Sequence, residues 1–201
     1  AKQRFLDWPS SPNQPGVEAG CRALLGWALK DAEILCNLLE EQEHAKKCRA
    51  ISKRLKKQIK QPNGLKQAAA LMSIAGLMKP EQACSEVISV GGAKDFSTFY
   101  GYYMLQALAQ AGEYQQALDI IRQYWGGMLD LGATTFWEDF NLDWTHNAAR
   151  LDDFVPEGKD DIHGDFGDYC YPSFRHSFCH GWASSLDDTA YFRRRDSGCR
   201  L

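Results

Sequence analysis

A carboxylate stands directly beside an indole at Trp137-Glu138, just after the small, polar segment GATT at 132–135. Contact with an indole removes water from one side of a carboxylate, and this desolvation raises the pKa towards the range used in general acid or base catalysis. The indole face would also suit stacking on the apolar face of a sugar ring. The same pair has a structural interpretation, in which Trp137 fills the core and Glu138 is a surface acid or an N-cap. These two residues alone leave both interpretations open.

Two histidines, His176 and His180, are four residues apart in the segment HSFCH, so they share one face of a predicted helix. Such a pair can bind Zn²⁺, with Cys170, His163 or Asp165 as further ligands. The glutamate of an HExxH motif and a CxxC pair, which would favour zinc, are both missing from the sequence. We therefore expect these histidines to hydrogen-bond within the fold or to contact a ligand, and we expect no metal and no cofactor.

Four aspartates lie close together at Asp160, Asp161, Asp165 and Asp168. Calcium-binding loops space their ligands in a fixed order and end on a bidentate glutamate, and this order is missing here. The aspartates therefore indicate a solvated loop. The motifs GxSxG and Walker A, and a strand-supported GxGxxG, are also absent from the sequence.

The formal net charge of −3 gives the chain no general attraction for nucleic acid or for anionic lipid. The basic segment KKCRAISKRLKKQIK at 46–60 has apolar residues at helical spacing, which is typical of a solvated helix face. The longest apolar runs are shorter than the roughly 20 residues of a membrane span. We expect no nucleic-acid or membrane partner. No signal peptide is visible, and the compartment stays open between cytoplasm and periplasm.

The seven cysteines are odd in number and include no CxxC pair. Four of them fall within helical patterns, where a free cysteine behaves as a small apolar residue. Reduced thiols are therefore expected.

Helical periodicity dominates the first two thirds of the chain and predicts an all-α fold in a single domain over 1–201. An extended N-terminal loop over 1–16 leads into helical hairpins over 17–132, because apolar residues recur every three or four positions and short turns interrupt them. The segment 139–172 is long, acidic and aromatic without periodicity, which is typical of a binding loop. A last helix over 173–185 and an irregular tail over 186–201 complete the prediction. The expected helices cover 17–42, 43–60, 65–78, 81–91, 97–112, 113–132 and 173–185.

Three segments resemble, in the same order, the catalytic domain of glycoside hydrolase family 78, the α-L-rhamnosidases. YWGGMLDLGATTFWEDF at 124–140 follows the helical stretch 99–123 and precedes PSFRHSFCHGWAS at 172–184. FLDWP at 5–9 is similar to the family's Asp-Trp segment. The most specific part of the resemblance is GATTFWE.

The resemblance implies an (α/α)₆-barrel toroid that hydrolyses terminal α-L-rhamnosyl bonds with inversion. In inverting enzymes one carboxylate activates water and a carboxylic acid protonates the leaving oxygen, with about 6.5–9.5 Å between them. Glu138 matches the family's general base, and His180 matches a histidine that contacts the sugar. Trp137 and Trp8 are candidates for an aromatic wall, and Asp7 for a residue that binds a sugar hydroxyl. The expected ligand is a rhamnose-containing oligosaccharide or glycoside.

The departures from the family matter equally. The family's general acid lies upstream of the Asp-Trp segment, and nothing in this chain matches it. About seven helices are predicted where a closed six-hairpin barrel has twelve, so the toroid is expected to be incomplete. We interpret the chain as a rhamnosidase fragment that lacks the general acid. The alternative is a non-catalytic α-helical module that binds carbohydrate or protein, and a homo-oligomer would cover its exposed helix faces.

Overall fold

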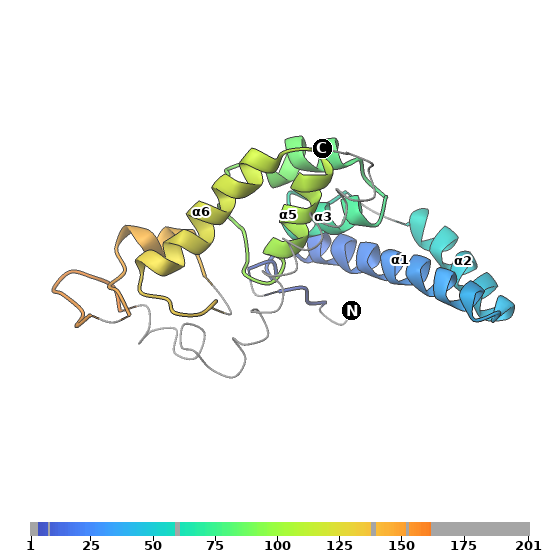
Figure 1. The fold of residues 1–201 in the computed structure, drawn as a ribbon, viewed down its shortest axis with the longest axis horizontal. Helices are drawn as coiled ribbons and strands as arrows, with labels where there is room; N and C mark the ends of the chain where they lie inside the picture. The colour runs from blue at the N-terminus through green and yellow to red at the C-terminus, as the bar shows by residue number, and fades with distance from the viewer. Residues whose placement is uncertain (1–3, 8, 59–60, 138–139, 152, 162–201) are drawn as a thin grey trace, which may run out of the picture. The chain divides into compact units, whose positions relative to one another are not determined.

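The computed structural model of the 201-residue chain describes residues 4–7, 9–58, 61–137, 140–151 and 153–161 (Figure 1). Within these ranges the structure is helical and contains no strand, with one isolated bridge between Ala148 and Asp160. The all-α prediction is therefore confirmed, while the toroid stays a prediction. The elements are α1 (Gln14–Leu38), α2 (Gln42–Lys56), α3 (Lys66–Ile74), α4 (Pro80–Ala83), the π-helical turn η1 (Cys84–Ile88), α5 (Gly101–Gln110), α6 (Tyr114–Asp130) and the 3₁₀ helix η2 (Leu142–His146).

The chain forms two compact units. Unit 1 comprises Ala1–Val90 and Tyr103–Tyr114, and unit 2 comprises Gly91–Tyr102 and Gln115–Leu201. Each unit buries its own set of apolar side chains. A single domain can contain more than one compact unit, so the expected single domain stays a prediction. In neither unit does a described helix have the length and hydropathy required to cross a bilayer.

The helix α1 begins three residues earlier than the predicted start at 17. Asn13 is its N-cap, and the Asn13 side chain accepts a hydrogen bond of 3.1 Å from the backbone N–H of Gly16. Pro15 lies in the first turn, where a missing N–H costs nothing. The N-terminal prolines predict an extended loop up to residue 16, whereas Pro15 lies in the first turn of α1.

Unit 1 is built on α1, which packs against both α2 and α3. A Cβ atom at Gly20 would lie 2.5 Å from Leu6 Cδ1 and 3.4 Å from Ala68 Cα, so the missing side chain allows close packing there. Leu6 is 8 % exposed and thus holds the N-terminal segment against the α1–α3 crossing. This contact fixes the residue that follows it, Asp7.

The helix α3 is buried all round, from Lys66 to Ser73. A helix with apolar residues on every face belongs to a core rather than to a surface. The helix predicted over 81–91 ends earlier in the structure. There α4 continues into the π-helical turn η1, which ends at Ile88. π-Helical turns of this kind are rare and are recognised from geometry rather than from apolar spacing.

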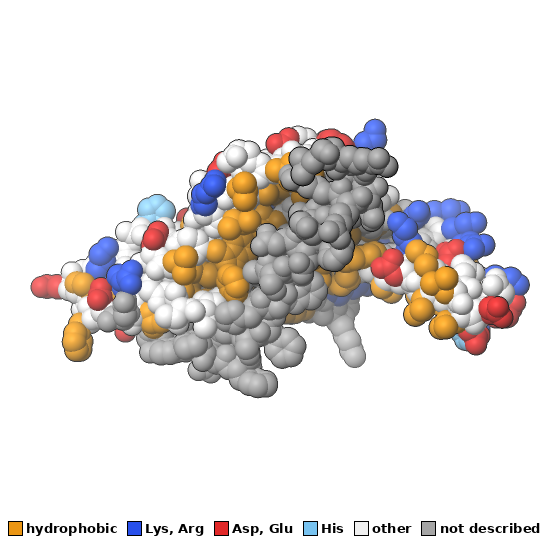
Figure 2. All heavy atoms as spheres, in the orientation of Figure 1, with side chains coloured by type: hydrophobic (Ala, Val, Ile, Leu, Met, Phe, Trp, Pro, Cys, Tyr) orange, Lys and Arg blue, Asp and Glu red, His pale blue; other side chains and the backbone are white. Residues whose placement is uncertain are grey.

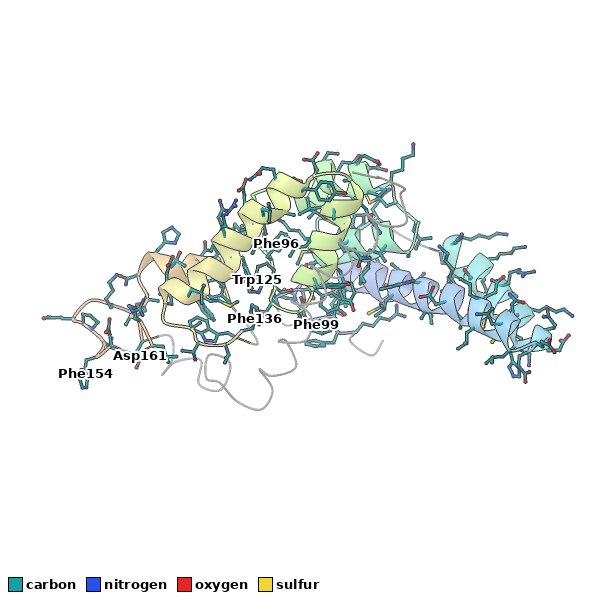
Figure 3. The ribbon with its side chains drawn as sticks, in the orientation of Figure 1. Phe96, Phe99, Trp125, Phe136, Phe154 and Asp161 are labelled. Atoms are coloured by element: carbon teal, nitrogen blue, oxygen red, sulfur yellow. The ribbon has the colours of Figure 1, made fainter. Side chains whose placement is uncertain are left out.

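Unit 2 is centred on α6 and on aromatic side chains that meet it. Tyr124 makes edge contacts with Trp125 and Phe140, with ring centroids 5.0 and 5.1 Å apart, and a tilted contact with Phe96 at 6.3 Å. Figure 3 labels Phe96, Trp125 and Phe136 on the same side of α6 in this view. This cluster is the core of unit 2.

The described part of the predicted loop 139–172 is more ordered than its sequence suggests. It contains η2, whose N-cap Asn141 accepts a bond of 2.9 Å from the backbone N–H of Asp143. The segment 147–160 then closes on itself, because Ala149 N donates to Asp160 O at 3.0 Å and Asp160 N donates to Asn147 O at 3.1 Å. Leu151 N donates to Leu131 O at 2.8 Å and ties this segment to the end of α6.

Candidate functional site

The structure describes two of the five predicted site residues, Asp7 in unit 1 and Trp137 in unit 2. Glu138, His180 and Trp8 lie outside the described residues. The surroundings of Asp7 and of Trp137 are therefore given separately.

Asp7 is held by a compact turn in unit 1. Its Oδ1 accepts a 3.1 Å bond from the backbone N–H of Ser10, and its own N–H donates to Ser10 Oγ at 3.3 Å. The hydroxyl of Ser11 donates to the carbonyl of Asp7 at 2.9 Å. Gln67 on α3 donates from Nε2 to Asp7 Oδ2 at 3.2 Å. The carboxylate thus has a fixed position, half-buried, between the N-terminal turn and the start of α3.

Two buried polar side chains at the start of α3 were missed by the sequence analysis. Lys66 is 4 % exposed and Gln67 is 1 % exposed. Lysine and glutamine are seldom buried without partners, and both of these residues have interactions in the structure. Their signal in the sequence is the pair Lys66-Gln67 at the start of the otherwise apolar run AAALMSI. Gln67 forms a polar cluster with Asp7 and Ser10 inside unit 1.

Trp137 is part of the core of unit 2, with 1 % exposure. Its ring makes an edge contact with Phe140, with centroids 5.8 Å apart, and Phe140 is also 1 % exposed. The hydroxyl of Tyr124 donates to the carbonyl of Phe140 at 2.6 Å. The residues on both sides of positions 138–139 are thus fixed by buried contacts. In this arrangement the indole anchors the segment, and an aromatic wall open to a ligand finds no support at this residue.

Among the described residues of unit 2, the buried hydroxyls Thr98 Oγ1 and Thr135 Oγ1 have no hydrogen-bond partner. Thr98 is 7 % exposed and precedes α5, and Thr135 lies two residues before Trp137 in the GATT turn. Buried polar groups nearly always have a hydrogen-bond partner, so we expect a water molecule or a ligand to bond each of these hydroxyls. Thr135 was not singled out in the sequence analysis, although it lies within its most specific motif.

The loop closed by Ala148 and Asp160 presents an aromatic side chain at its tip. Phe154 is completely exposed, with 101 % relative exposure, and the next residue, Val155, is 45 % exposed. Figure 3 shows Phe154 projecting away from the ribbon, with Asp161 at the base of the loop. An exposed aromatic on a loop fixed to a helix end is consistent with the predicted binding loop, which stays a prediction.

Three described thiols, those of Cys21, Cys36 and Cys84, are not suited to nucleophilic catalysis. Burial, followed by the charges of Glu113 and Glu81, raises the pKa of Cys84 from 9.0 to about 11. Burial also raises the pKa of Cys21 and that of Cys36, and the neighbouring Cys48 adds to the effect at Cys36. A thiol with a raised pKa holds little thiolate at neutral pH. All four described cysteines are free, as expected: Cys21, Cys36, Cys48 and Cys84.

Among the described residues, no group of three or more His, Cys, Asp or Glu could hold a metal ion. The ligands considered for zinc, His163, Asp165, Cys170, His176 and His180, lie outside the described residues, as do Asp165 and Asp168 of the aspartate group.

A scan against protein-family models gave no matching family, and searches of curated proteins and of solved structures gave no match.

Proposed function

We propose that this chain carries the base-side part of an inverting α-L-rhamnosidase site, with Glu138 as the general base. The observation that carries the proposal is the burial of the described residues that flank Glu138 in the sequence. Trp137 and Phe140, the described residues on either side of it, are each 1 % exposed, and the Tyr124 hydroxyl bonds the Phe140 carbonyl at 2.6 Å. A general base must be held in position, because catalytic geometry tolerates little displacement.

In this proposal Glu138 takes a proton from a water molecule as the water attacks the anomeric carbon of rhamnose. The bond to the leaving oxygen breaks on the opposite face, and the configuration inverts. The GATT turn contributes the hydroxyl of Thr135, which is buried without a partner and would bond a sugar hydroxyl. Asp7, which the family resemblance implies as a residue that binds a sugar hydroxyl, is held within unit 1 by Ser10 and Gln67.

No residue of this chain matches the family's general acid, so the expected activity is weak. A general acid contributes about 10²- to 10⁴-fold in rate, and most of that is needed for poor leaving groups. An aryl α-L-rhamnoside has a leaving group that departs with little protonation. The experiment is therefore hydrolysis of 4-nitrophenyl α-L-rhamnoside by the purified chain and by Glu138→Gln, with Glu113→Gln as the matched control because Glu113 is an exposed acid elsewhere in the chain.

We expect slow turnover that Glu138→Gln lowers about 10²-fold or more and that Glu113→Gln leaves unchanged. Proton NMR of the first product should show β-L-rhamnose, since the mechanism inverts. Azide should restore turnover of the glutamine variant and form β-L-rhamnosyl azide, because azide needs no base. Equal turnover by the wild type and by Glu138→Gln would refute the role of Glu138.

The alternative function is a non-catalytic α-helical module that binds carbohydrate or protein. It is favoured by the exposed apolar residues of α1, which include Leu35 at 55 % and Leu38 at 75 % exposure. L-Rhamnose titrated by saturation-transfer NMR separates the alternatives. Binding without turnover supports a carbohydrate module. The absence of both binding and turnover would reject the rhamnosidase proposal.

A further inference from the structure

An apolar stripe runs along α1 from Cys21 to the C-cap residue Leu39. Its members alternate at spacings of four and three residues, which is the spacing of the seam of a coiled coil. Leu25 is 47 % exposed, Leu35 is 55 % and Leu39 is 64 %. Leu38, at 75 %, falls within about 60° of Leu35 around the helix and widens the apolar surface near the helix end. The seam comprises four exposed residues, Leu25, Ala28, Leu35 and Leu39, and two half-buried ones, Cys21 and Ala32.

The stripe lies along one edge of the α1–α2 contact and away from the α1–α3 contact at Gly20. The helix α3 meets α1 at Gly20, and α2 meets it around Cys36, which hydrogen-bonds Cys48. Arg49 on α2 bonds Glu33 on α1 at 2.7 Å and marks one edge of the α1–α2 contact. On a helix of 3.6 residues per turn, the stripe falls at the opposite edge of this contact.

The same rotation places Ile51, Lys47 and Arg54 of α2 beside the stripe. Lys53 and Lys56 fall at the other edge of the α1–α2 contact, on the same side as Arg49. All four of these lysine and arginine residues, Lys47, Arg54, Lys53 and Lys56, are exposed. Figure 2 shows hydrophobic side chains next to Lys and Arg side chains at the end of unit 1 formed by α1 and α2. The result is an apolar seam with a basic border.

Charge decides what chemistry this surface accepts. The helix α2 contains six Lys or Arg residues and one acidic residue, Glu43: Lys46, Lys47, Arg49, Lys53, Arg54 and Lys56. A partner with carboxylates beside an apolar ridge complements this surface in both shape and sign. A second copy of the chain would bring its own basic helix towards this border, and like charges would meet.

The composition of the seam favours a partner helix over a membrane surface as its occupant. Ala28 and Ala32 are short and leave a shallow strip between the leucines, which the ridge of another helix can fill. Helices that lie in a membrane interface commonly carry Trp or Phe among their apolar residues, and this seam has neither.

We propose that the seam of α1, with the basic border of α2, is a docking site for an amphipathic helix of another protein that has leucines on one face and carboxylates beside them. Its mode is a helix laid against an apolar groove, with anchors spaced three and four residues apart. This proposal is independent of the rhamnosidase activity, since neither Asp7 nor Glu138 belongs to the seam.

The probe is a fluorescent synthetic helix of about three heptads with leucines at the seam positions and glutamates beside them. A second peptide has the same leucines and lysines in place of the glutamates. Anisotropy titrations use the full chain and two double variants, Lys47→Glu with Arg54→Glu, and Lys53→Glu with Lys56→Glu. Both double variants change the net charge equally, and all four positions are exposed, so circular dichroism should show intact helices in each.

We expect the glutamate peptide to bind, and the Lys47→Glu/Arg54→Glu variant to weaken it about tenfold or more, whereas the Lys53→Glu/Lys56→Glu variant weakens it less than about threefold. The first variant should also gain affinity for the lysine peptide. Leu35→Gln with Leu39→Gln should abolish binding of either peptide.

Several results would overturn the proposal. Equal effects of the two charge variants would show that the peptide does not bind beside Lys47 and Arg54. Equal affinity for the two peptides would show that the basic border takes no part in binding. Binding to phosphatidylserine vesicles that Lys47→Glu/Arg54→Glu abolishes, without peptide binding, would assign the surface to a membrane. A dimer in light scattering that Leu35→Gln/Leu39→Gln dissociates would assign it to a second copy.

Discussion

The hydroxyl of Tyr124 is the polar contact that fixes the Trp137 segment. It lies in a core of rings, is 1 % exposed, and donates to the Phe140 carbonyl at 2.6 Å. A buried carbonyl that loses its donor retains the cost of desolvation, which is larger than the net value of the hydrogen bond itself. The position of the Phe140 backbone, two residues after Glu138, therefore depends on this hydrogen bond.

Tyr124→Phe tests this dependence. It removes the donor and leaves the ring, so we expect the free energy of unfolding to fall by about 1–3 kcal/mol in urea denaturation. Tyr114→Phe is the matched control: Tyr114 is 63 % exposed, and the same change there should stay within about 0.5 kcal/mol. A similar effect of the two variants would show that the bond to Phe140 contributes nothing to stability.

At the residue scale, the sequence gives the types of the candidate residues and their spacing along the chain, but it does not give their tertiary contacts. Trp137 is buried, as the structural interpretation of the Trp-Glu pair required, and that burial weighs against a wall for the sugar. Asp7 was named from the family resemblance alone, because its partner Gln67 is 60 residues away along the chain. The partners of Lys66 and the unpaired hydroxyl of Thr135 depend on tertiary packing in the same way. No spacing rule gives contacts of this range.

At the scale of elements, helix existence followed from apolar spacing, and helix ends depended on local chemistry. The predicted helix over 113–132 corresponds closely to α6, Tyr114–Asp130, because a strong apolar pattern fixes the helix between two turns. The start of α1 was misplaced because Pro15 fits a loop as well as a first turn. The sequence does not predict the closed loop over 147–160, because backbone hydrogen bonds close it and these bonds have no side-chain pattern.

The contact between α5 and α6 gives a prediction from two glycines. A Cβ atom at Gly101 would lie 2.7 Å from Trp125 Cη2 and 2.9 Å from Cζ2, whereas a Cβ at Gly126 would meet nothing within 4 Å. Gly101→Ala should therefore destabilise the fold by about 1–3 kcal/mol, because the indole ring must move. Gly126→Ala should stabilise it by about 0.5–1 kcal/mol, since alanine costs less backbone entropy within a helix.

Thermal unfolding by circular dichroism measures both changes. Gly126→Ala is the matched control, because it makes the same substitution on α6 one residue after Trp125. If both variants stabilise the fold, Trp125 has room to move. If both destabilise it, an added methyl group is tolerated neither at Gly101 on α5 nor at Gly126 on α6.

At the scale of the whole molecule, the all-α class was predictable because periodicity is a property of many residues and survives errors at single ones. The division into two units was not predictable, because unit 1 and unit 2 each combine two separate stretches of the chain. Apolar spacing identifies which residues are buried, but it does not say which core they join. The segment Tyr103–Tyr114 belongs to the first core, although residues of the second core precede and follow it.

Hydrogen exchange tests whether the two cores are independent. Leu71→Ala opens a cavity in unit 1 and Met128→Ala opens one in unit 2, at side chains with 0 % and 2 % exposure. Each should cost about 2–5 kcal/mol. If each core stabilises its own unit, Leu71→Ala should reduce the protection of amides in α3, and Met128→Ala that of amides between Ile120 and Met128. Equal loss of protection in both units from either variant would instead establish one cooperative domain, as the apolar pattern of the sequence led us to expect.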